Sequence, residues 1–199
     1  ASNLAKQIEN VRIHGVSPVV AINAFPTDHA SEHEVIREIA RSMGARVAVC
    51  THFADGGAGA MDLAREVMAA CEEPTDFGFL YPDTASLREK IHAVATRVYG
   101  AAGVEYSPLA DEQIDRYEGN GYGTLPVCIA KTHLSISGDP KLKGAPTGHT
   151  LSVREVRASV GAGFVYPICG DMRTMPGLGA HPAAFGMDID AEGRISGLS

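Results

Sequence analysis

The sequence predicts an α/β protein in which parallel strand-helix units are followed by a smaller mixed α/β domain. The first observation is a continuous apolar run, SPVVAINA, at residues 17–24, which is typical of a strand covered on both faces. The second is that strand and helix patterns alternate twice in succession, which indicates a right-handed parallel crossover. The third is a change after Gly119, where glycine and proline become frequent. We expect two domains, 1–100 and 101–199.

A strand followed by a helix is predicted twice in the first domain. After the first strand, Ser31 and Glu34 have the spacing of a capping box, and Gly44 supplies the C-terminal stop of the helix. The run 46–50 is the second strand, and a helix follows it over 61–71. The apolar residues expected on one face of this helix are Leu63, Ala64, Val67 and Met68.

Further helices and short strands are predicted in the rest of the chain. An apolar stripe predicts a third helix over 84–99, which Gly100 ends. Pro108 has the place of a first helical residue and predicts a fourth helix. Short strands are expected at 126–130 and 163–168, and one short helix is expected near 153–159.

Composition and charge exclude several classes of function. With 45% hydrophobic residues the chain can bury a core, and its formal net charge of −7 repels a nucleic-acid backbone. No apolar run of about 18 residues and no signal-peptide pattern occurs, so we expect a cytoplasmic protein with no membrane partner. The four cysteines and eight histidines lack metal-ligand spacing, so we predict reduced thiols and no metal site. Neither the P-loop pattern nor the G-x-G-x-x-G pattern occurs.

Two loops, 25–30 and 51–59, leave the expected sheet at the carboxyl ends of its strands, where ligands of parallel α/β sheets bind. Each loop carries an aromatic residue near its start, Phe25 in one and Phe53 in the other. The two rings together are suited to hold one planar ligand from both sides. The alternative is that Phe25 caps the core and Asp28 only starts a turn.

Cations and hydroxyl residues gather in two loops of the second half, 131–133 and 141–150. Such loops suit phosphate or carboxylate ligands. Lys131 has the stronger case because it ends the apolar strand PVCIA, whereas Lys141 and Lys143 are typical of a solvated loop. A local positive field requires the fold to bring together Lys131, Lys141, Lys143, Arg154, Arg157 and Arg173.

Four long motifs occur in one order: VVAINAFPTD, RYEGNGYGTLPVCIAKTHLSIS, GAPTGHTLSVREVRASVGAGF and MRTMPGLGAHPAA. Their order and spacing resemble the formate-tetrahydrofolate ligase family, from near residue 3 to the end of the chain. The resemblance implies the C-terminal region of a P-loop-type ligase. That enzyme joins formate to tetrahydrofolate with ATP through formyl phosphate and gives 10-formyltetrahydrofolate, ADP and phosphate.

The same resemblance implies a folate pocket. Phe53 stands where the family often has tryptophan, so an aromatic face is kept but is smaller. The positions that match folate-binding residues of the family are Phe25, Pro26, Val49 and Phe53.

The resemblance also implies an adenine contact, and no catalytic residue is assigned. His149 replaces a common aromatic residue next to this contact. We add Lys131, because a lysine at the end of a strand suits a phosphate. The predicted nucleotide-binding residues are Pro146, Thr147, Gly148 and Lys131.

The glycine-rich phosphate loop, its lysine and the arginine that handles formyl phosphate belong to an N-terminal region that this chain lacks, and Mg with ATP is expected to bind mainly there. Because the chain opens Ala1-Ser2-Asn3 without Met, we interpret it as a cleaved or split piece. Because the phosphate-binding half is missing, we expect the isolated chain to be inactive. The expected partners are formate, tetrahydrofolate, ATP, that P-loop-containing region and further copies, since the family commonly forms tetramers. The alternative is a non-catalytic folate-binding or assembly module.

Overall fold

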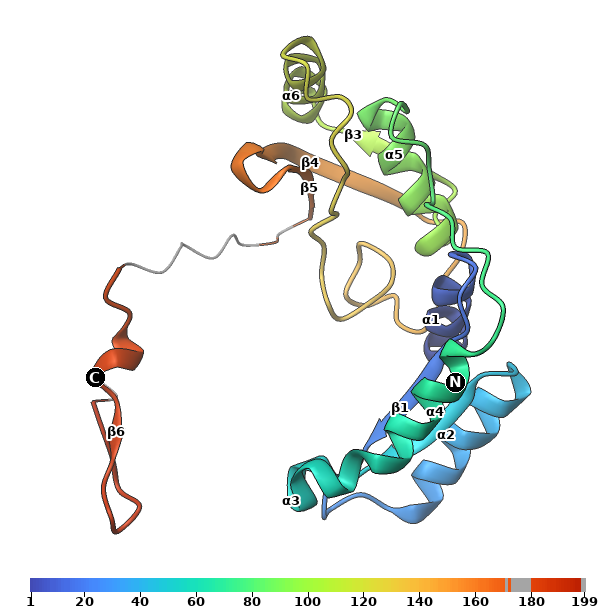
Figure 1. Ribbon diagram of the computed structural model, residues 1–199. Helices are drawn as coiled ribbons and strands as arrows, with labels where there is room; N and C mark the ends of the chain where they lie inside the picture. The colour runs from blue at the N-terminus through green and yellow to red at the C-terminus, as the bar shows by residue number, and fades with distance from the viewer. Residues whose placement is uncertain (171, 173–179, 198–199) are drawn as a thin grey trace.

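The computed structural model of the chain is a mixed α/β structure with a parallel sheet, a mixed sheet and a short antiparallel ribbon (Figure 1). It describes residues 1–170, 172 and 180–197. The helices are α1 (Ser2–Arg12), α2 (Ala30–Ser42), α3 (His52–Asp55), α4 (Met61–Cys71), α5 (Leu87–Ala93) and α6 (Pro108–Gly119). The strands are β1 (Val19–Asn23), β2 (Arg46–Cys50), β3 (Gly103–Tyr106), β4 (Thr150–Ser159), β5 (Phe164–Cys169), β6 (Asp188–Ile189) and β7 (Ile195–Ser196). The short 3-10 or π segments are η1 (Gly56–Ala60), η2 (Val94–Val98), η3 (Val160–Ala162) and η4 (Ala183–Gly186).

The first sheet confirms the predicted parallel unit. Strands β1 and β2 pair in parallel, with Val20 opposite Val47, and α2 forms the crossover between them. Helices α1 and α2 lie on one face, where Ile8, Ala40 and Ala45 form a buried apolar cluster with both strands. Helix α4 lies on the other face, mainly against β2. The carboxyl ends of β1 and β2 therefore lie side by side.

Helix α2 is capped differently from the prediction. It begins at Ala30, and the carboxylate of Glu32 accepts the N–H of the N-cap residue His29 at 3.1 Å. The predicted capping box of Ser31 and Glu34 is therefore wrong by two residues. The pairs His29–Glu32 and Ser31–Glu34 have the same spacing, so the sequence pattern alone does not show which pair caps the helix.

Helix α4 has the predicted bounds, but of the apolar residues expected on one face only Leu63 is partly buried. Val67 and Met68 are 43% and 69% exposed. Glu66 turns toward the sheet instead, because the guanidinium of Arg46 in β2 donates to its carboxylate at 3.1 Å. A prediction based only on the spacing of apolar residues does not detect a polar contact of this kind.

The second sheet contains the clearest error of the sequence prediction. Strand β4 lies between β3, which is parallel to it, and β5, which is antiparallel and confirms the strand expected at 163–168. The short helix expected near 153–159 is therefore wrong, because those residues belong to β4. A register shift between Val153 and Glu155 leaves Val153 and Val156 both buried at a spacing of three, which imitates a helix.

The remaining elements agree with the prediction in part. The third helix begins at Leu87, because Ser86 and Glu89 form a capping box in which the Glu89 carboxylate accepts the Ser86 N–H at 2.8 Å. It continues through η2, and Gly100 follows with a φ of 71°, a conformation that favours glycine. The predicted fourth helix is confirmed as α6. Residues 126–130 run along β5 but form only isolated bridges to it.

The larger core lies between α5, α6 and the second sheet. Its fully buried side chains include Leu87 and Ile91 of α5, Ile114 of α6 and Leu151 of β4. Because α5 belongs to this core, the packing favours a domain boundary between α4 and α5. The division into 1–100 and 101–199 stays a prediction.

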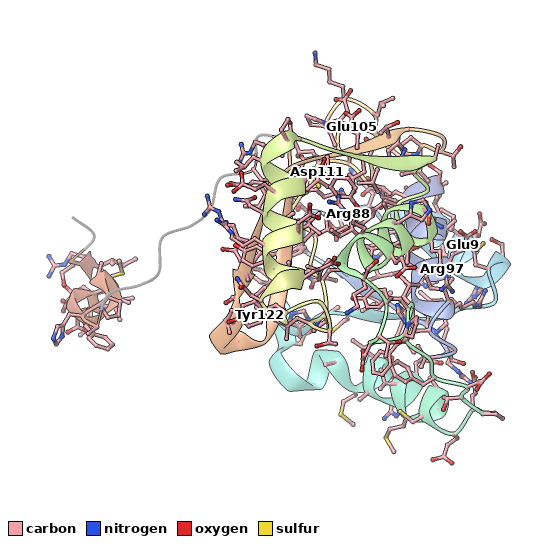
Figure 2. The ribbon with its side chains drawn as sticks, turned by 90° about the horizontal axis from the view of Figure 1, so that it is seen from above. Glu9, Arg88, Arg97, Glu105, Asp111 and Tyr122 are labelled. Atoms are coloured by element: carbon pink, nitrogen blue, oxygen red, sulfur yellow. The ribbon has the colours of Figure 1, made fainter. Side chains whose placement is uncertain are left out.

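An arginine joins α5 to α6 at the rim of this core. Arg88 points toward Asp111, as Figure 2 shows, and its guanidinium pairs with Asp111 and, at 2.9 Å, with Asp115. The same group lies 5.1 Å from the ring centroid of Tyr106 in β3. Because Arg88 is 36% exposed, each pair contributes at most about 1 kcal/mol, so apolar burial holds these elements together.

The buried leucine of α5 offers a test of this core. Replacing Leu87, which is 0% exposed, with alanine leaves a cavity and is expected to lower the free energy of unfolding by about 2 to 5 kcal/mol. The matched control is Leu109→Ala on α6, where the side chain is 49% exposed and the expected loss is less than about 1 kcal/mol. Urea denaturation of both variants gives the comparison. Equal losses would contradict the assignment of α5 to the core.

Candidate functional site

Two exposed phenylalanines meet at the carboxyl ends of β1 and β2. The ring centroids of Phe25 and Phe53 lie 5.0 Å apart, with their planes inclined by 52°. Their side chains are 43% and 65% exposed, so the pair forms an apolar face open to solvent. The structure thus brings together the two aromatic residues that the sequence singles out.

The pair does not form the open clamp that the sequence suggests. A ring stacked between two others holds them about 7 Å apart, because each contact needs about 3.5 Å between carbon atoms. The rings of Phe25 and Phe53 are closer than this and contact each other. In this conformation they offer one continuous aromatic face, and Phe25 does not cap the core.

The turn that carries Phe25 is held by Asp28. The backbone N–H of Phe25 donates to the Asp28 carboxylate at 2.8 Å, and the Asp28 N–H donates to the Phe25 carbonyl at 3.0 Å. The His33 imidazole lies 3.3 Å from the same carboxylate. The Phe25 N–H, then His33, lower the pKa of Asp28 from its ordinary value. Asp28 therefore holds the turn that carries Phe25. Its role is larger than that of a residue that only starts a turn, which was the alternative considered from the sequence.

The turn that carries Phe53 depends on a glycine. Phe53 lies in the short helix α3, which Thr51 precedes, and the Thr51 hydroxyl donates to the Asp55 carboxylate at 2.7 Å. The Thr51 N–H donates to the Gly59 carbonyl at 3.0 Å. A Cβ atom on Gly59 would lie 2.6 Å from the carbonyl carbon of Thr51, so only glycine fits there. The segment Gly56–Ala60 thus folds back on the end of β2.

The other two predicted folate residues have different surroundings. Pro26 is exposed beside Phe25. Val49 is half-buried in β2, opposite Ile22 of β1. Pro26 is therefore part of the exposed loop, whereas Val49 belongs to the sheet.

Lys131 is turned inward. Its ammonium group donates to the backbone carbonyls of Thr132 at 3.0 Å, of Ser137 at 3.2 Å and of Ser135. It also lies 5.0 Å from the ring centroid of Tyr99. Burial lowers the pKa of Lys131 and raises the pKa of Tyr99 to about 12. Since an ammonium group has three N–H donors, all three are occupied here, and Lys131 organises the 131–137 loop.

The predicted adenine segment packs on the start of β3. The Gly148 N–H donates to the Gly100 carbonyl at 3.0 Å, and the Ala102 N–H donates to the His149 carbonyl at 2.8 Å. Thr147 and Gly148 are exposed, whereas Pro146 is half-buried. Backbone bonds therefore hold this segment while Thr147 stays exposed.

His149 connects the adenine segment to Lys131. Both of its ring nitrogens are buried and have no hydrogen-bond partner among the described residues. Burial first, and then the charge of Lys131, lower the pKa of the imidazole. Both effects favour the neutral imidazole over its charged form.

Comparison with known proteins decides the family. The sequence model described as formate-tetrahydrofolate ligase matches residues 1–199. The chain belongs to the formate-tetrahydrofolate ligase family. Over its whole length it is 65% identical to the formate-tetrahydrofolate ligase of Saccharopolyspora erythraea and covers 35% of that protein. It is 59% identical to formate-tetrahydrofolate ligase 3 of Rubrobacter xylanophilus, with 36% covered, and 58% identical to the Cutibacterium acnes ligase, with 35% covered.

This member of the ligase family spans about a third of the length of the relatives that it matches. The folate and adenine assignments made from the four motifs stay predictions. Of the cations that the sequence groups together, Arg154 and Arg157 both pair with Glu155, at 3.4 and 3.0 Å. Lys141 and Lys143 are exposed, and Arg173 lies outside the described residues, as does the rest of 173–179 in the fourth motif.

Other features of this ligase-family chain escaped the sequence analysis. An open cavity of about 570 Å³ lies between α1 and the 131–144 loop, with Asn3 and Gln7 of α1 on one side and Lys131 on the other. The apolar spacing of Ile8 with its neighbours in α1 is the signal that could have found this helix. The described residues contain no cluster of three or more His, Cys, Asp or Glu side chains able to hold a metal ion. No helix among them is long and apolar enough to cross a membrane.

The link between Asp28 and Phe25 predicts a pH dependence. Because the folded-state pKa of Asp28 is lowered, its stabilising effect on the turn is full above the ordinary aspartate pKa and is lost as pH falls through the folded pKa. The Phe25 amide signal in ¹H–¹⁵N NMR spectra is expected to titrate with a midpoint below 3.8. Asp28→Asn is the control and is expected to abolish this step. A midpoint at or above 3.8 would contradict the hydrogen bond between the Phe25 N–H and the Asp28 carboxylate.

Proposed function

We propose that this chain supplies the tetrahydrofolate-binding face and an adenine contact of an ATP-dependent ligase that forms 10-formyltetrahydrofolate from formate through formyl phosphate. The observation that carries the proposal is the solvent-exposed contact of Phe25 and Phe53 at the carboxyl ends of two parallel strands. Large exposed aromatic side chains at this edge of a sheet are typical of a ligand site. Family membership supports the identity of the ligand.

The pterin of tetrahydrofolate suits this aromatic face. A planar ring system gains dispersion and quadrupole interactions against phenylalanine, and Phe25 sits on a turn fixed by Asp28. A pre-formed turn lowers the entropy lost on binding. The role of Phe25, Pro26 and Phe53 is to orient the pterin so that N10 meets an activated formyl group made elsewhere. Val49 is proposed to contribute from the adjacent strand β2.

The adenine contact is proposed for the segment Pro146, Thr147 and Gly148. The exposed Thr147 hydroxyl on a backbone fixed to β3 is suited to a hydrogen bond with a base. Lys131 contributes by shaping the neighbouring loop, because its ammonium group is already saturated by carbonyl oxygens. A direct phosphate contact from Lys131 would require the loop to open.

The remaining machinery is proposed to lie in the part of the ligase that this chain lacks, a P-loop-containing N-terminal region. Mg bound with ATP is proposed to lie mainly in that region as well. Phosphoryl transfer to formate needs positioned cations and phosphate-binding backbone groups. We further propose a cytoplasmic homotetramer. The alternative is a non-catalytic module that binds folate or promotes assembly.

The aromatic face is tested by tetrahydrofolate titration of the purified chain. Phe53→Ala removes a stacking surface and is expected to weaken binding about tenfold, whereas Phe53→Trp is expected to keep or tighten it. Phe79→Ala is the control, because Phe79 is also exposed (77%) and belongs to a different cluster. Isothermal calorimetry gives the affinities. Unchanged affinity in Phe53→Ala would exclude this face as the folate site.

The absence of the P-loop pattern from the sequence predicts that the chain alone makes no 10-formyltetrahydrofolate from ATP, formate and tetrahydrofolate. Phosphate release measured with each substrate omitted in turn provides the assay. Adding the part of the Saccharopolyspora erythraea ligase outside the matched region is expected to restore activity. Formate-dependent phosphate release by the chain alone would refute the proposal. Restored binding without restored activity would favour the non-catalytic alternative.

A further inference from the structure

The loop of residues 131–144, all of which the structure describes, borders two cavities and contains no helix or strand (Figure 1). Its first half lines the cavity of about 570 Å³ beside α1. Ser137 and Leu142 line a second cavity of about 270 Å³, whose other wall contains His149. Within this described segment Ile136 is the one buried apolar side chain, at 5% exposure. Opening the loop would therefore expose little apolar surface.

Lys131 ties the middle of this loop to its base. The base is fixed to β5, because the Ala130 carbonyl accepts the Cys169 N–H at 2.8 Å. From there the ammonium group of Lys131 reaches forward and donates to the carbonyls of Ser135 and, at 3.2 Å, Ser137. Hydrogen bonds from a charged donor are stronger than those between neutral groups. The ammonium group is therefore the main contact that holds the loop in its closed position.

The buried polar groups of the loop bond within the loop itself. The hydroxyls of Ser135 and Ser137 lie 2.8 Å apart, and the Ser137 N–H donates to the Ser135 hydroxyl at 3.0 Å. The Ser137 hydroxyl also donates to the Asp139 carbonyl at 3.0 Å. At the far end, the side-chain amide of Asn3 donates to the Gly144 carbonyl at 3.2 Å in an exposed contact. Opening the loop therefore breaks no hydrogen bond of the sheets.

The closed loop covers the imidazole of His149. Both ring nitrogens are buried and have no hydrogen-bond partner among the described residues. Buried polar side-chain atoms are normally hydrogen-bonded, and leaving them unpaired costs free energy. Ser137 and Leu142 of the loop stand across the smaller cavity from this residue. A movement of the loop that widens this cavity would give the imidazole access to hydrogen-bond partners.

We propose that residues 131–144 form a lid, latched by Lys131, that opens to let a nucleotide reach the imidazole of His149. A neutral imidazole has one donor and one acceptor nitrogen, so it can bond to the edge of a base. The ligand is expected to be a nucleotide because Thr147 of the proposed adenine contact precedes His149 by two residues. This choice of ligand rests on the proposed adenine contact, whereas the existence of the lid does not.

Amide hydrogen exchange of the chain alone tests whether the lid opens. The buried Ser137 N–H reports on the loop, and the Val165 N–H, which donates to the Pro126 carbonyl at 2.9 Å, reports on the core. After correction for intrinsic rates, Ser137 is expected to exchange at least about tenfold faster than Val165, with little dependence on low urea concentrations. If Ser137 exchanges as slowly as Val165, with the same urea dependence, the loop opens only when the whole chain unfolds, and the proposal is wrong.

A pair of lysine variants tests the latch. Lys131→Met removes the ammonium group but keeps an apolar stem, and is expected to speed exchange at Ser137 about tenfold while Val165 is unchanged. Lys141→Met is the matched control, because Lys141 is exposed in the same loop, and both rates are expected to stay unchanged. Equal rates at Ser137 in the two variants would exclude Lys131 as the latch. If Lys131→Met does not fold, the Val165 amide shows it, and the comparison in the wild-type chain still decides whether the lid opens.

Chemical labelling tests what the lid covers. Diethyl pyrocarbonate modifies neutral imidazoles that solvent reaches, and peptide mass spectrometry locates the label. In the wild-type chain His149 is expected to react at least about tenfold more slowly than the exposed His92, and in Lys131→Met its rate is expected to approach that of His92. If His149 reacts as fast as His92 in the wild-type chain, the loop does not cover it, and the proposal fails.

ATP titration by calorimetry tests the ligand separately from the lid. A ligand that binds only the open state binds more tightly when that state is more populated, so Lys131→Met is expected to tighten ATP binding up to about tenfold. His149→Phe keeps a ring without the nitrogens and is expected to weaken it about tenfold. Weaker binding by Lys131→Met would overturn the latch and assign Lys131 to a direct phosphate contact. If ATP binds to none of these chains, the proposed adenine contact fails, while the exchange and labelling results still decide the lid.

Discussion

The parallel pairing of β1 with β2 is the constraint on which the rest of the candidate site depends. Because both strands run in one direction, their carboxyl ends coincide, and the two loops that follow are forced into contact. Local bonds then refine the arrangement: Asp28 holds the first loop, and the close approach of Gly59 to Thr51 folds the second. Neither loop has a buried core of its own. The sheet register therefore fixes the distance between the aromatic rings.

Features with strong local signals were predictable from the sequence. The bounds of β2 and α4 and the Ser107-Pro108 start of α6 follow from apolar runs and capping residues, and the structure agrees. The meeting of Phe25 and Phe53 follows from topology alone. These predictions depend on residues near in sequence or on one general rule of parallel sheets.

Features set by distant contacts were not predictable. The bulge in β4 gives buried residues the spacing of a helix, and only pairing with β5 reveals a strand. The buried face of α4 is decided by Arg46, which lies in another element. Lys131 reads as a free cation because the sequence does not show that three carbonyl oxygens of its own loop surround it. In each case a tertiary partner overrides a local pattern.

The contact between Phe25 and Phe53 sets a threshold for any ligand that inserts between them. In the resting conformation each ring shields part of the other from water, so separating them exposes apolar surface before new stacking forms. A wide, flat ring system recovers that loss on both faces, whereas a small or buckled molecule does not. Insertion between the rings would therefore select ligands by size and planarity. Every ligand that inserts has to separate the rings, and only a ligand of the right shape recovers that free energy through new contacts.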